Sequence, residues 1–290
     1  MSEIIKPEDK GGETISLLDL DGDYFPPDLQ PDVIRDLMKF NFRPDDVIIC
    51  SYPKTGCHWI WEITRMLLSD CTELDPTEKE LCMMEWQSQD TLDPLPSPRV
   101  LNTHVLTRQM NPKLLNVRSK IVFMLRNAKD TAVSFYHHHL KLPEYEYKGS
   151  WADYLDLFLT GKVDYGSVFD YMRDWERFIE HHPDFPLIVM TYEDLKEDPV
   201  REIDRLSQFL NKRQDRDFLQ KVADACSFKR MRDRKGHNWL TNGGETIFYR
   251  KGEVGDWKNW FTVAQNEHFD KVAQVKMASS CFRLKETIDL

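Results

Sequence analysis

The sequence predicts an α/β fold in which helices flank a central parallel β-sheet within a single domain. Three short apolar runs, at residues 47–50, 121–125 and 187–190, are too continuous for half-solvated strands and are typical of buried parallel ones. A helical pattern follows each run, and strand, loop and helix recurring in this order favour a parallel sheet. Because ligands of such sheets bind at the carboxyl ends of the strands, we expect the functional residues directly after these runs.

Each predicted helix has its own local signals. After the first run, apolar residues recur at i, i+3 and i+7 over about residues 59–68. After the second run, Asn127 can cap a helix, with Asp130 three residues on in the manner of a capping box. After the third run, Asp198 is a good N-cap and Pro199 suits the first helical position.

The chain divides unevenly along its length. Residues 1–30 are polar and interrupted by prolines and glycines, so we expect an irregular N-terminal lead-in there. No repeat, low-complexity run or linker interrupts residues 31–290. We expect these residues to form one continuous domain.

Composition limits the classes of function. The 290 residues are 41% hydrophobic, which is ample for a packed core and excludes general disorder. The 39 lysines and arginines against 49 aspartates and glutamates give a formal net charge of −10, so the molecule as a whole repels phosphate backbones and we expect no nucleic-acid partner. An anionic ligand therefore requires a local pocket in which a few cations and backbone N–H groups outweigh the overall field.

Neither a leader nor a metal site is predicted. The N-terminus has no basic segment followed by an apolar one, and no stretch approaches the length of a membrane span, so we expect a cytoplasmic protein without a membrane partner. The six cysteines form no C-x-x-C pair, which indicates reduced thiols. Three consecutive histidines at residues 137–139 cannot all face one side of a helix or strand, so we expect no metal ligands there.

The loop after the first run has the composition of an anion cradle. Residues 51–59 read Ser-Tyr-Pro-Lys-Thr-Gly-Cys-His-Trp, so that Lys54 and Gly56 precede a helix N-terminus whose free N–H groups and dipole attract anions. The loop is not a Walker A motif, because there the glycines precede the lysine. Taken alone, it also fits an ordinary turn between a strand and a helix.

The loop after the second run carries a second candidate pair. Arg126 ends the strand and Ser134 lies about two turns into the next helix. Both side chains could reach a phosphate at that helix N-terminus. On its own, this segment also fits a surface arginine and a solvated helix.

Three motifs in this order closely resemble those of the cytosolic sulfotransferases, which use 3′-phosphoadenylyl sulfate (PAPS) as sulfonate donor. They are Tyr-Pro-Lys-Thr-Gly at 52–56, Arg-Asn-Ala-Lys-Asp-Thr-Ala-Val-Ser-Phe-Tyr at 126–136 and Arg-Lys-Gly-Glu-Val-Gly-Asp-Trp-Lys at 250–258. The resemblance extends from about Asp45 to Arg283. It implies a P-loop-like nucleotide-binding core and a phenol- or steroid-type sulfotransferase that converts PAPS to adenosine 3′,5′-bisphosphate (PAP) without a metal.

The resemblance also implies the residues that hold the donor. They divide among the 5′-phosphosulfate, the 3′-phosphate and the adenosine, and each type suits its task, since a guanidinium binds two phosphate oxygens and glycine lets backbone N–H groups approach. The first group is matched by Lys54, Thr55, Gly56, Cys57, His58 and Trp59, the second by Arg126, Ser134, Arg250, Lys251 and Gly252, and the third by Trp59, Tyr192 and Phe228. The remaining cofactor contacts are matched by Cys226, Ser227, Met231 and Phe248.

Catalysis requires a base for the proton of the acceptor hydroxyl or amine. His104 follows a strand expected to begin near Val100, and it matches the family's catalytic histidine. By the same resemblance, Lys54 stabilises charge on the leaving phosphate oxygen and Ser134 restrains that lysine until the acceptor arrives. The acceptor, a small and aromatic or apolar molecule, would contact Asn102, Thr103, His104, Phe25, Trp86 and Tyr136, with Tyr24, Phe135, His137 and Phe248 as further aromatic candidates.

Four residues depart from the family's pattern. Asn102 stands where many members carry a lysine, which removes one cation beside the base. Cys57 and His58 replace hydroxyl residues in the phosphosulfate loop, and Cys226 stands where threonine is common. Cys57, close to Lys54 and a helix N-terminus, could have a lowered thiol pKa, although a simple fit of its small size is the favoured reading.

Two further segments, at residues 229–235 and 258–267, lie toward the C-terminus. The segment from Lys258 to Glu267 resembles the family's short dimerisation motif and suggests a homodimer, while Thr262 and Gln265 also form a capping-box pattern. The basic residues between positions 229 and 235 are interpreted as a mobile segment over the cofactor rather than a nucleic-acid patch.

Two alternative functions remain open at the sequence level. A kinase or NTPase could use Lys54 with Glu193 and Asp194 as its metal-binding end, although the Walker A order is missing. A non-catalytic protein could bind PAP without transferring sulfonate, although His104, Lys54 and Ser134 are all present.

Overall fold

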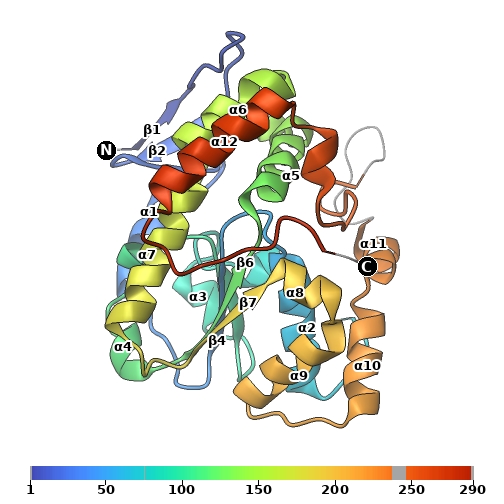
Figure 1. The fold of residues 1–290 in the computed structure, drawn as a ribbon. Coiled ribbons are helices and arrows are strands. Elements are labelled where there is room, and N and C mark those ends of the chain that lie inside the picture. Colours follow the sequence, from blue (N-terminus) through green and yellow to red (C-terminus); the bar gives the residue numbers. More distant parts are fainter. Residues whose placement is uncertain (1, 75, 237–245, 289–290) are drawn as a thin grey trace.

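The centre of the molecule is a four-stranded parallel sheet. The computed structural model describes residues 2–74, 76–236 and 246–288. The strands β4 (Val47–Ser51), β5 (Val100–Thr103), β6 (Lys120–Leu125) and β7 (Leu187–Thr191) lie in the order β5-β4-β6-β7, and every neighbouring pair is parallel (Figure 1). The predicted α/β fold with a parallel sheet is confirmed.

The register brings the carboxyl ends of three strands to one level. Cys50 of β4 pairs with Thr103 of β5 on one side and with Phe123 of β6 on the other. The chain passes from β4 to β5 on one side and later to β6 on the other, so the sheet changes direction at β4, where α/β proteins bind their ligands. The loops after these three strands therefore meet at one edge.

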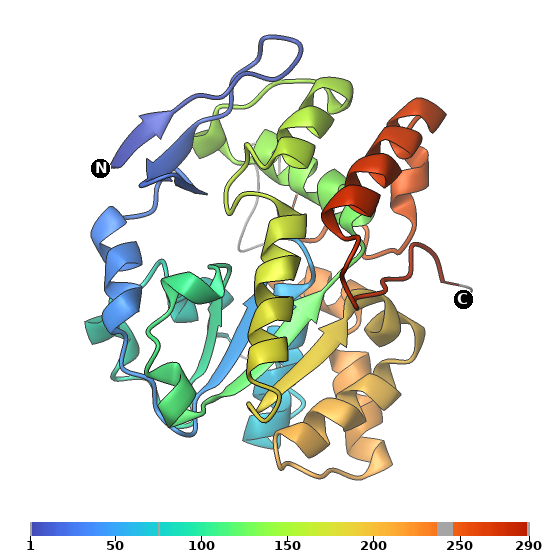
Figure 2. The ribbon, with the colours of Figure 1, turned by 60° about the vertical axis from the view of Figure 1, so that its left-hand side comes forward.

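Alternation along β4 divides the core into two layers. Ile48 and Cys50 belong to the hydrophobic cluster on one face, whereas Val47 and Ile49 belong to the cluster on the other. Figure 2 shows the yellow helix α7 crossing one of these faces. The longer helices are α2 (Cys57–Ser69), α9 (Pro199–Phe209) and α10 (Arg216–Ala225) in the second cluster, and α5 (Ala128–Lys141), α6 (Trp151–Thr160), α7 (Val168–His181) and α12 (Val263–Lys276) in the first.

The helix signals in the sequence are confirmed at their predicted positions. The Asn127 side chain accepts a hydrogen bond from the backbone N–H of Asp130 at 2.8 Å, and Asp198 caps α9 with Pro199 in its first turn. The short elements are α1 (Pro31–Asp36), η1 (Leu37–Lys39), η2 (Lys79–Cys82), α3 (Gln89–Leu92), η3 (Thr107–Gln109), α4 (Leu114–Val117), η4 (Pro143–Tyr145), α8 (Tyr192–Glu197), α11 (Phe228–Lys235) and η6 (Asp256–Asn259).

Two expectations about strands are corrected. The segment from Ser2 to Phe25 is not an irregular lead-in, because β1 (Ser2–Ile5), β2 (Leu17–Leu20) and β3 (Asp23–Phe25) form an antiparallel sheet whose apolar side joins the main core. The glycines of this segment lie in the connections between strands, as at Gly22, where φ is 92°. The third apolar run, β7, is only partly buried, since it forms an edge of the sheet.

The basic segment after residue 228 is a helix and not a mobile loop. It forms α11, and several of its cations are paired with acidic groups. Arg234 lies 3.0 Å from Glu73, and Lys235 pairs with Glu62 of α2. These contacts fix α11 against neighbouring parts of the chain.

A buried ion pair joins the amino ends of β4 and β5, and we expect its loss to be costly. Arg99 donates through Nε and Nη2 to Asp46 at 2.8 and 2.6 Å, and both side chains are buried. Arg99→Met leaves a buried carboxylate without its partner and should lower the free energy of unfolding by about 3–5 kcal/mol. Urea denaturation measures this loss. The double variant with Asp46→Leu should recover most of it, and an equal loss in both variants would contradict the assignment.

Candidate active site

A large pocket opens at the carboxyl edge of the sheet. Its cavity volume is about 330 Å³. One end is lined by residues of α2, α5, α11 and the segment 248–252, and the other by residues of the loops around Pro26, Trp86 and Tyr145. Lys54 and His104 line it as well, so the loops after β4 and β5 both contribute, as the register requires.

The loop after β4 needs unusual backbone angles to turn into α2. Lys54 has φ of 68°, and Gly56, the N-cap of α2, has φ of 105°. A Cβ at position 56 would lie 2.9 Å from the Tyr192 ring, so glycine is required both for the angle and for the space. Thr55 lies behind the pocket wall, where its hydroxyl donates to the Tyr52 carbonyl at 2.7 Å.

The Lys54 amine lies beside aromatic and imidazole groups. Its Nζ is 3.3 Å from His138 Nδ1 and 4.9 Å from the centre of the Phe248 ring. Burial, followed by repulsion from Lys79, lowers the pKa of Lys54 to about 7. Within the described residues the amine bonds to His138 and not to Ser134, which lines the pocket nearby.

Two of the three guanidinium nitrogens of Arg126 donate to backbone carbonyls of the described residues. Its two terminal nitrogens donate to the carbonyls of Lys54 and Glu253 at 3.2 and 2.9 Å, and its guanidinium carbon lies 4.2 Å from the centre of the Tyr192 ring. Its Nε is buried, and no group in the described part of the chain bonds to it. A buried donor without a partner in a pocket wall is a position for a ligand acceptor.

The segment at residues 250–252 covers the same end of the pocket. Arg250 Nη1 and Lys251 Nζ each lie 2.6 Å from a different oxygen of Asp256. Burial alone would raise the pKa of Asp256, but hydrogen bonds from these cations lower it to about 2. Gly252 has φ of 71°, and a Cβ there would lie 2.2 Å from the Phe228 ring.

Aromatic rings form the remaining wall of this end. The Trp59 and Tyr192 rings meet edge to face, with 5.2 Å between their centres. The centres of the Phe228 and Tyr249 rings are 6.3 Å apart. Ser227 and Met231 also line the pocket at the start of α11. These flat surfaces and the cations beside them suit a ligand that combines an aromatic ring with phosphates.

His104 is fixed in one tautomer. Its Nδ1 lies 2.6 Å from the Ser51 carbonyl oxygen, which can only accept, so Nδ1 carries the hydrogen and Nε2 is left to accept a proton. Burial, and then the charge of Lys79, holds the pKa of His104 well below its ordinary value. The imidazole is therefore neutral at neutral pH, which is the form a general base needs.

The two residues before His104 do not reach the pocket. Asn102 faces Lys79, with its Oδ1 accepting from Lys79 Nζ at 3.0 Å and its Nδ2 donating to the Lys79 carbonyl at 2.8 Å. Thr103 is buried and accepts a bond from the Val105 N–H at 3.2 Å. Neither residue lines the cavity, in contrast to what the resemblance implied.

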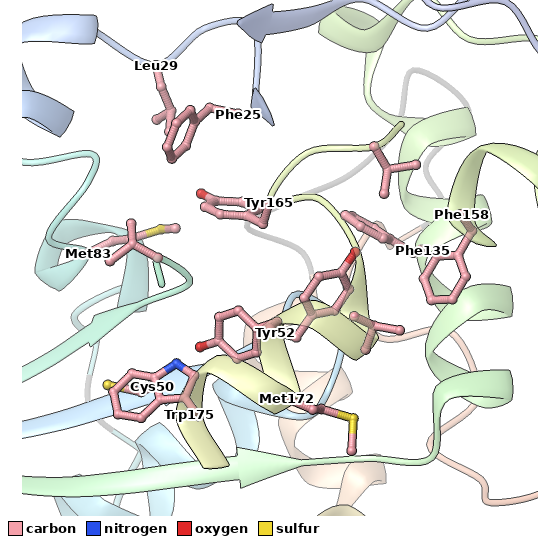
Figure 3. Close-up of a cluster of buried hydrophobic side chains, with 14 of the residues drawn as sticks. Phe25, Leu29, Cys50, Tyr52, Met83, Phe135, Phe158, Tyr165, Met172 and Trp175 are labelled. Carbon is pink, nitrogen blue, oxygen red and sulfur yellow. The ribbon is translucent and has the colours of Figure 1, made fainter. Parts of the chain in front are cut away.

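The acceptor residues expected from the sequence are mostly core residues. Trp86 lines the pocket, but Phe25 and Phe135 are buried among other apolar side chains (Figure 3), and the Tyr136 hydroxyl donates to the Gly149 carbonyl. His137 packs on Trp260. Tyr24 and Phe25 line a second cavity of about 230 Å³ that shares His104 and Tyr165 with the first.

Other residues, which carry no motif, line the opposite end of the pocket. They come from four separate segments and combine apolar, aromatic and acidic side chains. They are Pro26, Asp28, Met83, Leu142, Glu144, Tyr145, Asp164 and Tyr165. The sequence also did not predict that Asp256 pairs with Arg250 and Lys251, or that His138 contacts Lys54. The run of three histidines was noted in the sequence, but without this contact.

Comparison with known proteins identifies the family. A model described as the sulfotransferase domain matches residues 44–281. The chain is 34% identical to human sulfotransferase 1C2 over 290 aligned positions, covering 92% of this chain and 94% of that protein, and 33% identical to dog sulfotransferase 1B1 over 271, covering 88% and 90%. The chain belongs to the sulfotransferase family. None of the helices within the described residues has the length and apolar composition of a membrane span.

A solved structure shares the fold of this sulfotransferase. Mouse sulfotransferase SULT7A1, solved in complex with PAP, superposes with a TM-score of 0.77 at 29% identity, covering 91% of this chain and 95% of that one. A retinol dehydratase solved with androsterone and inactive cofactor PAP has the same TM-score at 19% identity, covering 95% and 92%, and shows the fold alone.

The two unusual cysteines, Cys57 and Cys226, both line the pocket, but their thiols are not activated. Burial raises the pKa of Cys57, so its thiol is not activated, and the favoured reading that it fits by size agrees with this. The Cys226 thiol lies 3.6 Å from the sulfur of Met66 in the core, and burial raises its pKa too. All six cysteines are free thiols.

Glu193, the carboxylate that the kinase alternative needs to bind a metal, is engaged in hydrogen bonds within the protein. Glu193 accepts from the backbone N–H and the side-chain amide of Asn127 at 2.9 and 3.1 Å, so it braces the loop after β6. Burial raises the pKa of Glu193, which disfavours the charged form that a metal needs. Asp194 pairs instead with Lys285 at 2.8 Å.

Proposed function

We propose that this sulfotransferase moves the sulfonate group of PAPS to a hydroxyl or amine of a small aromatic or apolar acceptor, with His104 as general base. The observation that carries this proposal is the large pocket, whose lining combines cations and aromatic rings at one end with apolar, aromatic and acidic side chains at the other, and includes Lys54 and His104. Sulfonate transfer itself follows from the family.

The residues present fit the donor. The buried and unpartnered Nε of Arg126 and the exchangeable cations Arg250 and Lys251 suit the 3′-phosphate. Gly252 leaves the face of Phe228 open for close approach. The start of α2 supplies N–H groups and the positive end of its dipole for the phosphosulfate.

The chain's own groups divide the work of transfer. PAPS supplies a sulfonate whose bond to the 5′-phosphate oxygen breaks, leaving its electron pair on that oxygen, as sulfur bonds to the acceptor. His104 Nε2 accepts the acceptor proton, and the Ser51 carbonyl stabilises the imidazolium that forms through Nδ1–H. Lys54, with its pKa near 7, becomes fully protonated as negative charge builds beside it.

The acceptor end favours a molecule that carries a ring and a positive charge. Met83, Tyr145 and Tyr165 offer apolar surface, while Glu144 and Asp28 add acidic groups. Burial, and then the crowding of the neighbouring carboxylates, raises the pKa of Glu144, so a bound ammonium would relieve that repulsion. Phenols with an alkylamine substituent therefore suit this end better than anionic phenols.

Replacing the base tests the proposed function. His104→Ala should lower kcat for PAPS-dependent transfer by about 10²- to 10⁴-fold while PAP affinity, measured by calorimetry, stays nearly unchanged. His268→Ala, at an exposed position on α12, is the control and should behave like the unmodified enzyme. If transfer survives His104→Ala, the proposed base is wrong.

A glycine pair tests the donor end. Gly252→Ala drives a Cβ into the Phe228 ring and should weaken PAP binding at least about tenfold, or about 1.4 kcal/mol. Gly22→Ala carries the same backbone strain at φ of 92°, with nothing within 4 Å of its Cβ, and should leave PAP binding intact. Equal PAP affinity in the two variants would argue against this placement of the donor.

A neutral replacement tests the acceptor class. Glu144→Gln should lower kcat/KM for amine-bearing phenols by about three- to fivefold relative to neutral phenols, a modest factor because Glu144 is partly exposed. Glu146→Gln, two residues on and paired with Lys6 outside the pocket, is the matched control. An unchanged ratio of the two acceptor types would contradict an acidic acceptor end.

We also propose a homodimer formed through the segment from Lys258 to Glu267 and action in the cytoplasm. Thr262 and Gln265 cap α12 as a capping box, and the next residue, Val263, is 76% exposed. The free cysteines agree with a reducing compartment. Sedimentation that finds only monomer at micromolar concentration would remove the dimer.

A further inference from the structure

Lys79 is a buried cation in the wall of the active-site pocket. It belongs to η2, lines the cavity together with Lys54 and His104, and is only 4% exposed. Lysine is almost never buried to this extent unless it is paired, because an ammonium loses its hydration there. A buried ammonium in a pocket that receives an anion needs an explanation beyond packing.

The side chain is aimed by a residue of β5. Lys79 Nζ donates to Asn102 Oδ1 at 3.0 Å, and Asn102 Nδ2 donates back to the Lys79 carbonyl at 2.8 Å. This reciprocal pair ties both the backbone and the amine of Lys79 to the strand that ends beside His104. Glu80 Oε1 lies 3.6 Å from the amine, and Glu80 is shared with His58 at 2.9 Å.

Lys79 keeps its charge where Lys54 does not. Burial acts to lower the pKa of Lys79, but the acidic groups around it, Cys57, Glu80 and Glu85, hold that pKa above its ordinary value. The pKa of Lys54 is about 7, so at neutral pH this amine is only partly protonated before an anion binds. Beside Lys54, Lys79 therefore supplies a positive charge that is present before an anion binds.

We propose that Lys79 is a catalytic cation of sulfonate transfer, delivered from η2 and held by Asn102 so that its ammonium contacts the sulfonate between Lys54 and His104. It keeps its protons and donates hydrogen bonds to the sulfonate oxygens, while the proton of the acceptor goes to His104 and the electron pair of the broken bond stays on the phosphate oxygen. This inference rests on the proposed donor and base.

The same arrangement accounts for the departure at position 102. The sequence alone indicated that Asn102 removes a cation beside the base. In the structure Asn102 instead accepts from a cation that comes from 23 residues earlier in the chain. A positive charge is therefore still present beside His104, but it is carried by Lys79 of η2 instead of by a residue of β5.

The variant Lys79→Met removes the charge and keeps the length of the side chain. We expect kcat to fall about 10²-fold, as for other lost donors at a developing charge. PAP affinity should change by less than about threefold, since PAP has no sulfonate. A general loss of stability would instead affect PAP binding and turnover together.

A double variant tests whether the charge, rather than the residue, matters. Lys79→Met with Asn102→Lys places an ammonium on β5 next to the original position and should recover at least about tenfold of the lost kcat. Lys129→Met is the matched control, because Lys129 is also a buried and ion-paired lysine but does not line the pocket. Its kcat should stay within about threefold of the unmodified enzyme.

The pKa of His104, followed by NMR in the protein without ligands, is a readout independent of turnover. Lys79 lowers the pKa of His104, so Lys79→Met should raise it, and the acid limb of kcat/KM should move to higher pH. The groups that face His104 are Ser51, His58, Lys79, Glu80, Glu85, His138 and Tyr165. Of these, only Lys79 changes in this variant.

The inference is overturned if Lys79→Met, folded and binding PAP normally, keeps kcat within about threefold, or if kcat falls only in parallel with PAP affinity. Should Lys79→Met fail to fold, Asn102→Ala keeps the ammonium and removes the group that aims it, and an unchanged kcat in that variant would overturn the inference as well. Failure of the proposed function is distinguishable, because the unmodified enzyme would then show no transfer from PAPS.

Discussion

The common level of the carboxyl ends of β4, β5 and β6 is the constraint on which the active site depends. Cys50 stands opposite both Thr103 and Phe123, so the chain leaves the sheet at one height in three places. Lys54, His104 and Arg126 follow those exits, and groups from distant parts of the sequence line one pocket. At the other end of β4 and β5, the buried pair of Arg99 with Asp46 holds the same register.

Local charge and overall charge act in opposite directions in this molecule. The chain carries a formal net charge of −10, yet Lys54, Lys79 and Arg126 lie around one cavity. Burial lowers the pKa of Lys54 and of His104, and the charge of Lys79 lowers both further. An anion that enters therefore meets cations, among them Lys54, whose amine gains a proton easily, and a neutral imidazole at His104.

The parallel sheet, the alternation of strands and helices along the chain, and most residues that line the cationic end of the pocket could be predicted from the sequence because their signals are local. Apolar runs, caps such as Asn127 and motifs such as the loop at Lys54 lie within a few residues of each other. The acceptor end could not be predicted in this way. Phe135 and Tyr136 point into the core because of how α5 packs, and Met83 and Tyr145 reach the pocket from loops without a pattern. The position of Lys79 in the pocket wall could not be predicted either, because its partner Asn102 is 23 residues away in the sequence.

The pairing of Arg250 and Lys251 with Asp256 has a consequence for how the donor end meets a phosphate. Both cations already hold a carboxylate of the chain at 2.6 Å, so the phosphate of the proposed donor would enter by exchange for an anion and not by neutralising bare charge. Few counterions are released in such an exchange, and the dependence of donor affinity on salt concentration is shallower than a count of the cations suggests. The selectivity of this end then depends on the shape of the phosphate and the reach of each donor, and only weakly on the total charge of the ligand.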